Sequence, residues 1–111
     1  MHNIEPQRLK EEMEKGTSMN IVDLQDSAGY QHAHIPGAIN IPFDEFAKYF
    51  PGTLKDKGIS IVLYGEYDEL GKGTESGLML ETAGYKQIGR VVGGLRGWQE
   101  AGYPTEGGWE S

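Results

Sequence analysis

The sequence predicts an α/β domain of three layers, in which helices cover both faces of a central, mostly parallel sheet. Short runs of apolar residues alternate along the chain with segments of helical character, which is the pattern of strands joined by crossover helices. Each run is apolar nearly throughout and not only at alternate positions, as expected for strands buried on both faces. A length of 111 residues accommodates one such domain and leaves no room for a second.

The first predicted element is a short amphipathic helix near the N-terminus, opened by residues 3–6. Pro6 suits the first turn of a helix, because the N–H that proline lacks would have no partner there. Leu9 and Met13 lie four residues apart and therefore share one face, and Gly16 ends the helix.

Four apolar runs are predicted as strands, and the run 59–64 is the strongest because it is the longest and is rich in β-branched residues. The four runs are 21–24, 38–41, 59–64 and 88–92. A helix over 44–50 is predicted from its acidic first turn and from aromatic residues spaced by three and four. A further helix extends through Leu80, with Thr74 or Ser76 as its N-cap.

The composition excludes several classes of function. Seventeen acidic residues against ten basic ones give a net charge of −7, which disfavours nucleic acids and anionic membranes as partners. No apolar run approaches the roughly 18 residues of a membrane span. The N-terminus lacks the basic segment followed by an apolar segment that is typical of a signal peptide. The chain has no cysteine, which excludes disulfides, thiolate metal sites and thiol redox chemistry. We therefore expect a cytoplasmic protein without a cofactor.

Two separated blocks are the most specific features of the chain. Residues 34–42 read His-Ile-Pro-Gly-Ala-Ile-Asn-Ile-Pro, and residues 93–104 read Gly-Gly-Leu-Arg-Gly-Trp-Gln-Glu-Ala-Gly-Tyr-Pro. Together they resemble the rhodanese-like domain family, from about Met19 to Thr105. The resemblance implies a single α/β/α domain over the whole chain, with a sheet of about five strands and a short C-terminal tail over 106–111.

The residues that match the family are expected to serve mainly the fold. They are Asp23, His34, Pro36, Gly37, Gly93, Gly94 and Trp98. Proline followed by glycine suits a tight turn, and the glycine pair permits a close approach of the backbone. The ring of His34 is expected to bond to nearby backbone and fix that turn, while Trp98 buries its ring. Gln25 stands where the family usually has arginine.

The resemblance implies a functional site after strand 59–64, where the family has a cysteine that carries sulfur as a persulfide. Loop amides and a helix N-terminus there lower the thiol pKa and hold an anion, and an arginine adds positive charge. The cysteine position is filled by Gly65 if Tyr64 ends the strand, or by Tyr67 if residues are counted back from 83–85. The residues equivalent to the active-site loop are Gly65, Glu66, Tyr67, Asp68, Glu69, Leu70, Gly71, Lys72, Gly73 and Thr74.

The charge of this loop also departs from the family pattern. Glu66, Asp68 and Glu69 crowd where an anion would dock, and Lys72 is the only cation of the loop. Each like-charge contact costs about 1 kcal/mol or more, so thiosulfate, phosphate and arsenate are expected to bind poorly. The loop is about two residues longer than in ordinary sulfurtransferases. In this greater length the loop resembles that of dual-specificity phosphatases. The resemblance ends there, because the cysteine and the arginine of those enzymes are both missing.

Other nucleophiles and metal sites are weaker alternatives. Thr74 and Ser76 lack an adjacent general base, and a carboxylate attacking a phosphoryl group would lack a metal or a basic clamp. Glu66, Asp68, Glu69 and Glu75 have the composition of a calcium site without its spacing. His32 and His34 make a metal pair without a third ligand.

We therefore expect a non-catalytic binding or regulatory module with a protein partner. Aromatic and apolar residues around the pocket suit this function, because such residues are enriched at interfaces. They are Tyr64, Tyr67, Leu70, Trp98, Tyr103 and Trp109. The alternative is an enzyme: a sulfurtransferase by family, or a phosphatase-like or divalent-metal-binding activity of the acidic loop.

Overall fold

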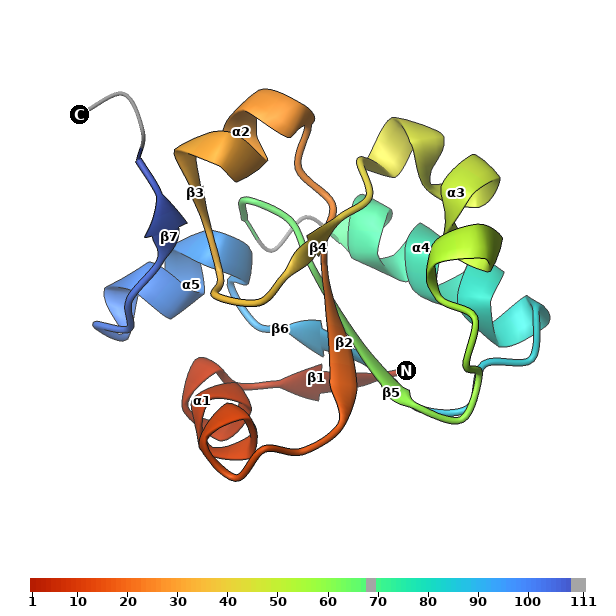
Figure 1. Cartoon of the computed structure of the whole chain (residues 1–111), viewed down its shortest axis with the longest axis horizontal. Coiled ribbons are helices and arrows are strands. Elements are labelled where there is room, and N and C mark those ends of the chain that lie inside the picture. Colours follow the sequence, from red (N-terminus) through yellow and green to blue (C-terminus); the bar gives the residue numbers. More distant parts are fainter. Residues whose placement is uncertain (68–69, 109–111) are drawn as a thin grey trace.

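The computed structural model describes residues 1–67 and 70–108 and shows a sheet between two layers of helices (Figure 1). The strands of this sheet are all parallel and lie in the order β1-β6-β5-β2-β4. Their bounds are β1 His2–Ile4, β2 Met19–Asp23, β4 Ile39–Asn40, β5 Ser60–Tyr64 and β6 Ile88–Val91. The prediction of a mostly parallel sheet of about five strands is confirmed.

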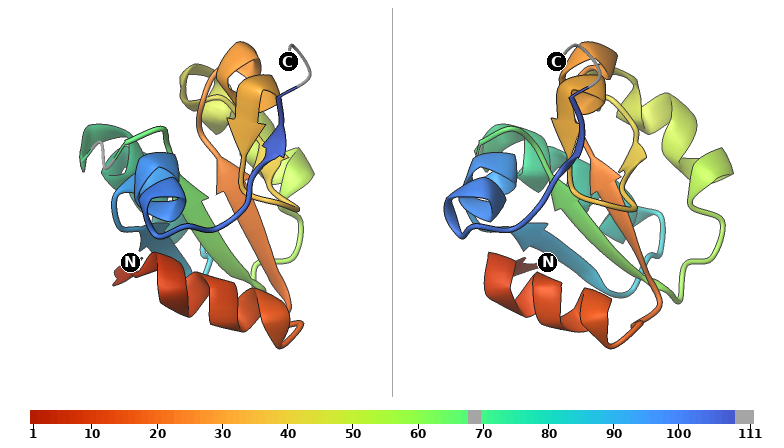
Figure 2. Two further views of the ribbon diagram at one scale, coloured as in Figure 1. Left: turned by 90° about the vertical axis from the view of Figure 1, so that its left-hand side faces the viewer. Right: turned by 60° about the vertical axis from the view of Figure 1, so that its left-hand side comes forward.

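Each face of the sheet is covered by two helices (Figure 1 and Figure 2). One face carries α1 (Pro6–Glu14) and α5 (Gly94–Glu100). The other carries α3 (Phe46–Thr53), which follows a 3-10 turn over Phe43–Glu45, and α4 (Leu70–Thr82). Within the described residues, no helix is both long and apolar enough to cross a membrane.

Two hydrophobic clusters hold these layers together, because successive side chains of a strand point to opposite faces of the sheet. On β5, Ile61 and Leu63 belong to the cluster beneath α3 and α4. Val62 and Tyr64 belong to the cluster beneath α1 and α5, together with the fully buried ring of Trp98. The central strand therefore supplies side chains to both clusters.

The sequence does not predict strand β1, which forms one edge of the sheet beside β6. The predicted helix starts too early, because residues 2–4 are extended and α1 begins at Pro6. Glu5 has a ψ of 148°, as expected for a residue held out of the helical region by the proline that follows it. Pro6 is thus the first helical residue, and the chain before it is free to pair with the sheet.

Helix α4 starts earlier than predicted. It begins at Leu70, so the prediction of Thr74 or Ser76 as its N-cap is wrong. Both residues lie inside the helix, and Ser76 is fully buried. Residues 70–74 are likewise helical and not part of the loop. Glycine lowers the helix propensity of this segment, which holds Gly71, Gly73 and Gly77, and this explains the weak sequence signal.

A short helix and a small second sheet lie at the carboxyl end of the main sheet (Figure 1). Helix α2 (Ser27–His32) is capped by Asp26, whose Oδ1 accepts a hydrogen bond of 2.8 Å from the Gly29 amide. Strand β3 (Ala33–His34) pairs in antiparallel fashion with β7 (Glu106–Gly107). The first two residues of the predicted tail therefore form a strand.

A pair of leucines on α4 tests the packing of the outer layer. Leu80 is fully buried and Leu78 is 55% exposed. Leu80→Ala is expected to lower the free energy of unfolding by about 2–5 kcal/mol, because it removes buried methyl groups and leaves a cavity. Leu78→Ala, the matched control, should change it by less than about 0.5 kcal/mol. Urea denaturation measures both, and equal losses would contradict this packing of α4.

Candidate functional site

The candidate site lies where β5 ends, at the carboxyl edge of the main sheet. Tyr64 is the last residue of the strand and is buried, and Gly65 follows it directly. Tyr67 lies two residues further on and is 52% exposed. The two positions considered for the lost nucleophile thus differ in setting, one at the end of the strand and one at the surface. Asp68 and Glu69 lie outside the described residues.

The loop after β5 is held against the first turn of α5. The amide of Leu95 donates a hydrogen bond of 2.8 Å to the Gly65 carbonyl oxygen. The amide of Arg96 donates one of 3.0 Å to the Glu66 carbonyl oxygen. Gly94 permits this contact, since a Cβ there would lie only 2.6 Å from the Gly65 oxygen. These amides of α5 are therefore bound to the loop.

Arg96 also neutralises one of the acids of the loop. Its guanidinium lies 3.4 Å from the carboxylate of Glu66, and both side chains are about half exposed. The same guanidinium lies 5.2 Å from the centre of the Tyr67 ring, within the range of a cation–π interaction. The side chains of Glu66, Tyr67 and Arg96, which we call the surface triad, form one connected group at the mouth of the site.

Two further cations lie close to the loop. Arg90 of β6 packs its aliphatic stem against the start of α4, because a Cβ at Gly73 would lie 2.5 Å from the Arg90 Cδ. The ammonium of Lys72 lies 6.0 Å from the centre of the Phe43 ring. Lys72 is the only cation within the loop equivalents, yet arginines from β6 and α5 join it in space. The sequence reveals Arg90 only through the adjacency of β5 and β6.

The space enclosed beneath the loop is very small. It has a volume of about 10 Å³, which is close to the minimum that one water molecule needs. Its walls are formed by Tyr64, Gly65, Tyr67, Lys72, Gly73, Arg90 and Val91. A second, open space of about 140 Å³ lies beside Gly65, and Glu66, Lys72, Gln25 and Asp26 are among the residues that line it.

A wider groove of about 410 Å³ lies beside the loop, between α2 and α5. The side chains of Gln25 and His32 line it on one side, and those of Arg96 and Gln99 on the other. Glu66 of the surface triad also faces it. The groove is polar and open, so it suits a larger partner better than a small ion.

The end of β2 holds a fully buried carboxylate, that of Asp23. Its Oδ1 accepts a hydrogen bond of 2.8 Å from the backbone amide of Gln25. Its Oδ2 accepts one of 2.9 Å from the side-chain amide of Gln25, which also donates to the Ala33 carbonyl oxygen at 3.1 Å. A neutral amide therefore faces this carboxylate at the place where the family usually has a cation.

Burial raises the pKa of Asp23 above its ordinary value, although hydrogen bonds from Tyr64 and Gln25 act in the opposite direction. Burial and the neighbouring Asp23 charge raise the pKa of Tyr64 far enough to keep its hydroxyl protonated. The same hydroxyl accepts a hydrogen bond of 3.0 Å from the Ile35 amide. Asp23, Tyr64 and Gln25 thus join the ends of β2 and β5 to the turn that follows β3.

That turn is built around Pro36 and Gly37. Gly37 has a φ of 84°, which suits the third position of a type II turn and favours glycine. The Nδ1 of His34 donates a hydrogen bond of 2.7 Å to the Tyr30 carbonyl oxygen, and the two rings stack with centroids 3.8 Å apart. The Nε2 of His34 lies 3.6 Å from the carboxylate of Glu106 on β7.

The structure removes two residues from the expected contact surface. Tyr64 and Trp98 are buried in the core, because they fill the cluster beneath α1 and α5. Tyr103 is partly buried, with its ring centroid 5.0 Å from that of Trp98. Tyr67 remains as an exposed aromatic side chain. The predictions for the Leu70 side chain and for Trp109 lie outside the described residues.

The metal sites weighed as weaker alternatives gain no support from the geometry. Among the residues that the structure describes, no group of three or more histidine, aspartate or glutamate side chains is placed to hold a metal ion. Glu75 is exposed on α4. The acidic cluster also includes Asp68 and Glu69, which are outside the described range, so the calcium hypothesis stays a prediction.

Comparison with known proteins identifies the family. The family model for the rhodanese-like domain matches residues 5–101. The chain belongs to the rhodanese-like domain family. A solved rhodanese-like domain of the Alr3790 protein from Anabaena sp. superposes with a TM-score of 0.85 at 31% identity, covering 98% of this chain and 81% of that one. Thiosulfate sulfurtransferase from Pseudomonas aeruginosa shares the fold, with a TM-score of 0.85 at 18% identity over 96% of this chain and 20% of that one.

Two curated relatives of the rhodanese-like chain are longer proteins. The putative sulfur carrier protein YrkF of Bacillus subtilis is 30% identical over 91 residues, which are 81% of this chain and 46% of that protein. The HTH-type transcriptional regulator Rv0324 of Mycobacterium tuberculosis is 31% identical over 90 residues, which are 81% of this chain and 38% of that protein. The chain therefore spans less than half the length of either relative.

A matched pair of glycine substitutions tests the contact between the loop and α5. Gly94 and Gly102 both have positive φ, at 61° and 87°, but a Cβ at Gly102 would have no neighbour within 4 Å. Gly102→Ala is expected to lower the free energy of unfolding by about 1–2 kcal/mol through backbone conformation alone. Gly94→Ala should cost about 1–3 kcal/mol more, because its Cβ displaces the loop carbonyls. Denaturant unfolding measures the difference, and equal losses would argue against the contact.

The buried Asp23 carboxyl predicts a distinct dependence of stability on pH. Its pKa is raised in the folded state, so the folded chain holds the proton more tightly than the unfolded chain does. Relative to the non-titrating variant Asp23→Asn, the wild type should lose stability as pH rises from about 3.9, the unfolded value, through the raised pKa. Urea denaturation at a series of pH values gives this difference, and an increase with pH would contradict the raised pKa.

Proposed function

We propose that this chain is a non-catalytic member of the rhodanese-like family that works as a binding or regulatory module. The observation that carries the proposal is Gly65 in the first position after β5, in a chain that holds no cysteine. Persulfide transfer requires a thiolate nucleophile, and glycine has no side chain to supply one. Gly65 is the better equivalent of the lost cysteine than Tyr67, because Tyr64 ends the strand.

The surroundings of Gly65 support the same proposal. The space beneath the loop has room for about one water molecule, and the amides of Leu95 and Arg96 are bound to loop carbonyls. Arg96, a cation beside the loop, is paired with Glu66. An oxyanion beneath the loop would have to displace these contacts, and the open space of about 140 Å³ beside Gly65 is lined by the acids Glu66 and Asp26 as well as by Lys72.

The partner is proposed to contact the surface triad and the groove between α2 and α5. Tyrosine and arginine are enriched among the residues that contribute most to protein interfaces. Tyr67 and Arg96 are both about half exposed. Arg96 lines the groove of about 410 Å³ and lies 5.2 Å from the centre of the Tyr67 ring. In both curated relatives the matched segment is part of a longer protein, which supports a role beside another domain or protein.

Sulfur transfer is the second candidate function, because one relative is named a putative sulfur carrier protein. Turnover separates the two candidates. The purified chain is expected to form no thiocyanate from thiosulfate and cyanide above the buffer background, because no residue can carry the sulfur. An active rhodanese domain assayed in parallel serves as the control. Thiocyanate formed in proportion to the concentration of this chain would overturn the proposal.

Restoring the thiol alone is not expected to restore activity. Gly65→Cys supplies a nucleophile, but the loop keeps its ion pair between Glu66 and Arg96 and the small space beneath it. We expect thiocyanate formation by this variant to stay at background, although its thiol reacts with a chromogenic disulfide. That thiol titration confirms that the cysteine is accessible. Turnover comparable to the active control would show that the loop geometry does not prevent catalysis.

A further inference from the structure

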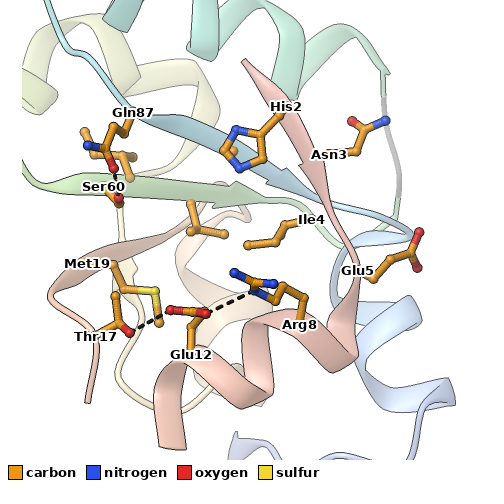
Figure 3. A pocket seen from close by; sticks show the side chains of 13 residues that line it. His2, Asn3, Ile4, Glu5, Arg8, Glu12, Thr17, Met19, Ser60 and Gln87 are labelled. Carbon is orange, nitrogen blue, oxygen red and sulfur yellow. Dashed lines mark hydrogen bonds and ion pairs between the residues drawn. The ribbon is translucent and has the colours of Figure 1, made fainter. Parts of the chain in front are cut away.

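A second cavity lies away from the loop, between α1 and the amino-terminal halves of the strands (Figure 3). Its volume is about 490 Å³, within the range of about 300–1,000 Å³ that is usual for small-molecule sites. Its walls come from β1, α1 and the first residues of β2, β5 and β6. No residue of the loop after β5 lines it, so any role it has is independent of the proposed function.

The floor of this cavity joins apolar side chains, among them Ile4 and Val62, to one glycine. The strand registers place His2, Gly89 and Val62 side by side across β1, β6 and β5. Gly89 has no side chain, and the His2 imidazole occupies the space above it. Ile4 and Val62 also line the cavity. The imidazole of His2 lies over the strands of the sheet (Figure 3). A Cβ at Gly89 would meet the His2 ring at 3.2 Å.

The wall formed by α1 carries a cation. Arg8 lies in the first turn of the helix, where no acidic residue is present and no side chain caps the N-terminus. The partial positive charge of a helix N-terminus adds to that of the guanidinium and favours an anion there. Two carboxylates also line the cavity: Glu12 is paired with Arg8, and the side chain of the N-cap residue Glu5 points away from Arg8 (Figure 3). Arg8 uses its Nε in the ion pair with Glu12, at 3.0 Å. The two terminal nitrogens of the guanidinium lie at the cavity, beside Ile4 (Figure 3).

Glu12 holds this guanidinium in place. Its carboxylate accepts a hydrogen bond of 2.7 Å from the Thr17 hydroxyl and lies 3.7 Å from the ammonium of Lys15. The hydrogen bond from Thr17 is the largest of the effects that lower the pKa of Glu12, ahead of the charges of Lys15 and Arg8. Glu12 therefore stays ionised and acts as a positioning residue for Arg8, which is itself 64% exposed and open to a ligand.

We propose that this cavity binds a small aromatic carboxylate, with the ring beside the His2 imidazole against Ile4 and Val62, and the carboxylate on Arg8. A planar ring fits the apolar side chains of Ile4 and Val62 and can stack on the outer face of the His2 imidazole. A guanidinium with two free terminal nitrogens matches the two oxygens of a carboxylate. The combination of an apolar floor with one placed cation is typical of small-molecule sites and selects this class of ligand.

Titration with 3-phenylpropionate, followed by NMR of the isotopically labelled full chain, tests the proposal. We expect saturable shifts of the amides of Ile4, Val62 and Gly89. The neutral analogue 3-phenylpropanamide should bind about tenfold more weakly or worse, because it lacks the charge-assisted contact with Arg8. Shifts confined to the loop after β5, or no saturable shift, would overturn the proposal.

Two substitutions on α1 form a matched pair. Arg8→Gln and Lys10→Gln each remove one positive charge and one ion pair four residues along the helix, but only Arg8 lines the cavity. Arg8→Gln should weaken binding of the acid about tenfold or more and leave binding of the amide unchanged. Lys10→Gln should bind both as the wild type does. Equal binding of the acid by both variants would overturn the role of Arg8.

Filling the floor gives a second, independent test. Gly89→Val places a β-branched side chain in a strand, which favours the strand conformation, and the atoms nearest to its Cβ belong to the exposed His2, whose ring can turn aside. The melting temperature should hold or rise while binding of both the acid and the amide is lost. Retained binding would contradict the site. Tighter binding of a peptide that ends in phenylalanine than of 3-phenylpropionate would reassign the cavity to a protein partner.

Discussion

The contact between the loop after β5 and the glycine pair at the start of α5 determines the arrangement of the candidate site. A side chain at Gly94 would strike the loop carbonyls, so the loop lies on the helix only because glycine is there. Once it lies there, the amides of α5 bind loop oxygens, and Arg96 in the same turn reaches Glu66. This position of the loop against α5 determines the size of the space beneath the loop and the exposure of Tyr67.

The order of the longer elements, from α1 and β2 through β4, α3, β5, α4 and β6, could be predicted from the sequence, because long apolar runs and specific turn residues have strong local signals. The run 59–64 and the pair Pro36–Gly37 are examples, and the structure places a buried strand at the first and a turn with positive φ at the second. The short elements α2, β3 and β7 were not predicted. Strand β1 could not be predicted, since its short, polar sequence becomes extended only through Pro6 and pairing with β6. The start of α4 was missed because its first turns are rich in glycine.

The electrostatics of the site could be predicted only in part. The sequence gives the acids of the loop directly, since they are neighbours in the chain. It does not give Arg90 or Arg96, which reach the loop through the adjacency of β6 to β5 and through the turn into α5. The loop is therefore less anionic in its folded surroundings than its sequence indicates. The cavity beside α1 could not be predicted from the sequence either, because its floor forms where β1 and β5 pair with β6 at Gly89.

Because the side chains of β5 are divided between two hydrophobic clusters, the two layers of helices are linked during unfolding. Ile61 and Leu63 anchor one layer of helices, and Val62 and Tyr64 anchor the other, all within one strand. Neither layer can be released without disturbing the side chains that hold its opposite, because the strand between them is shared. The two layers are thus coupled into one cooperative unit, and a local loosening of either is transmitted through the sheet to the other.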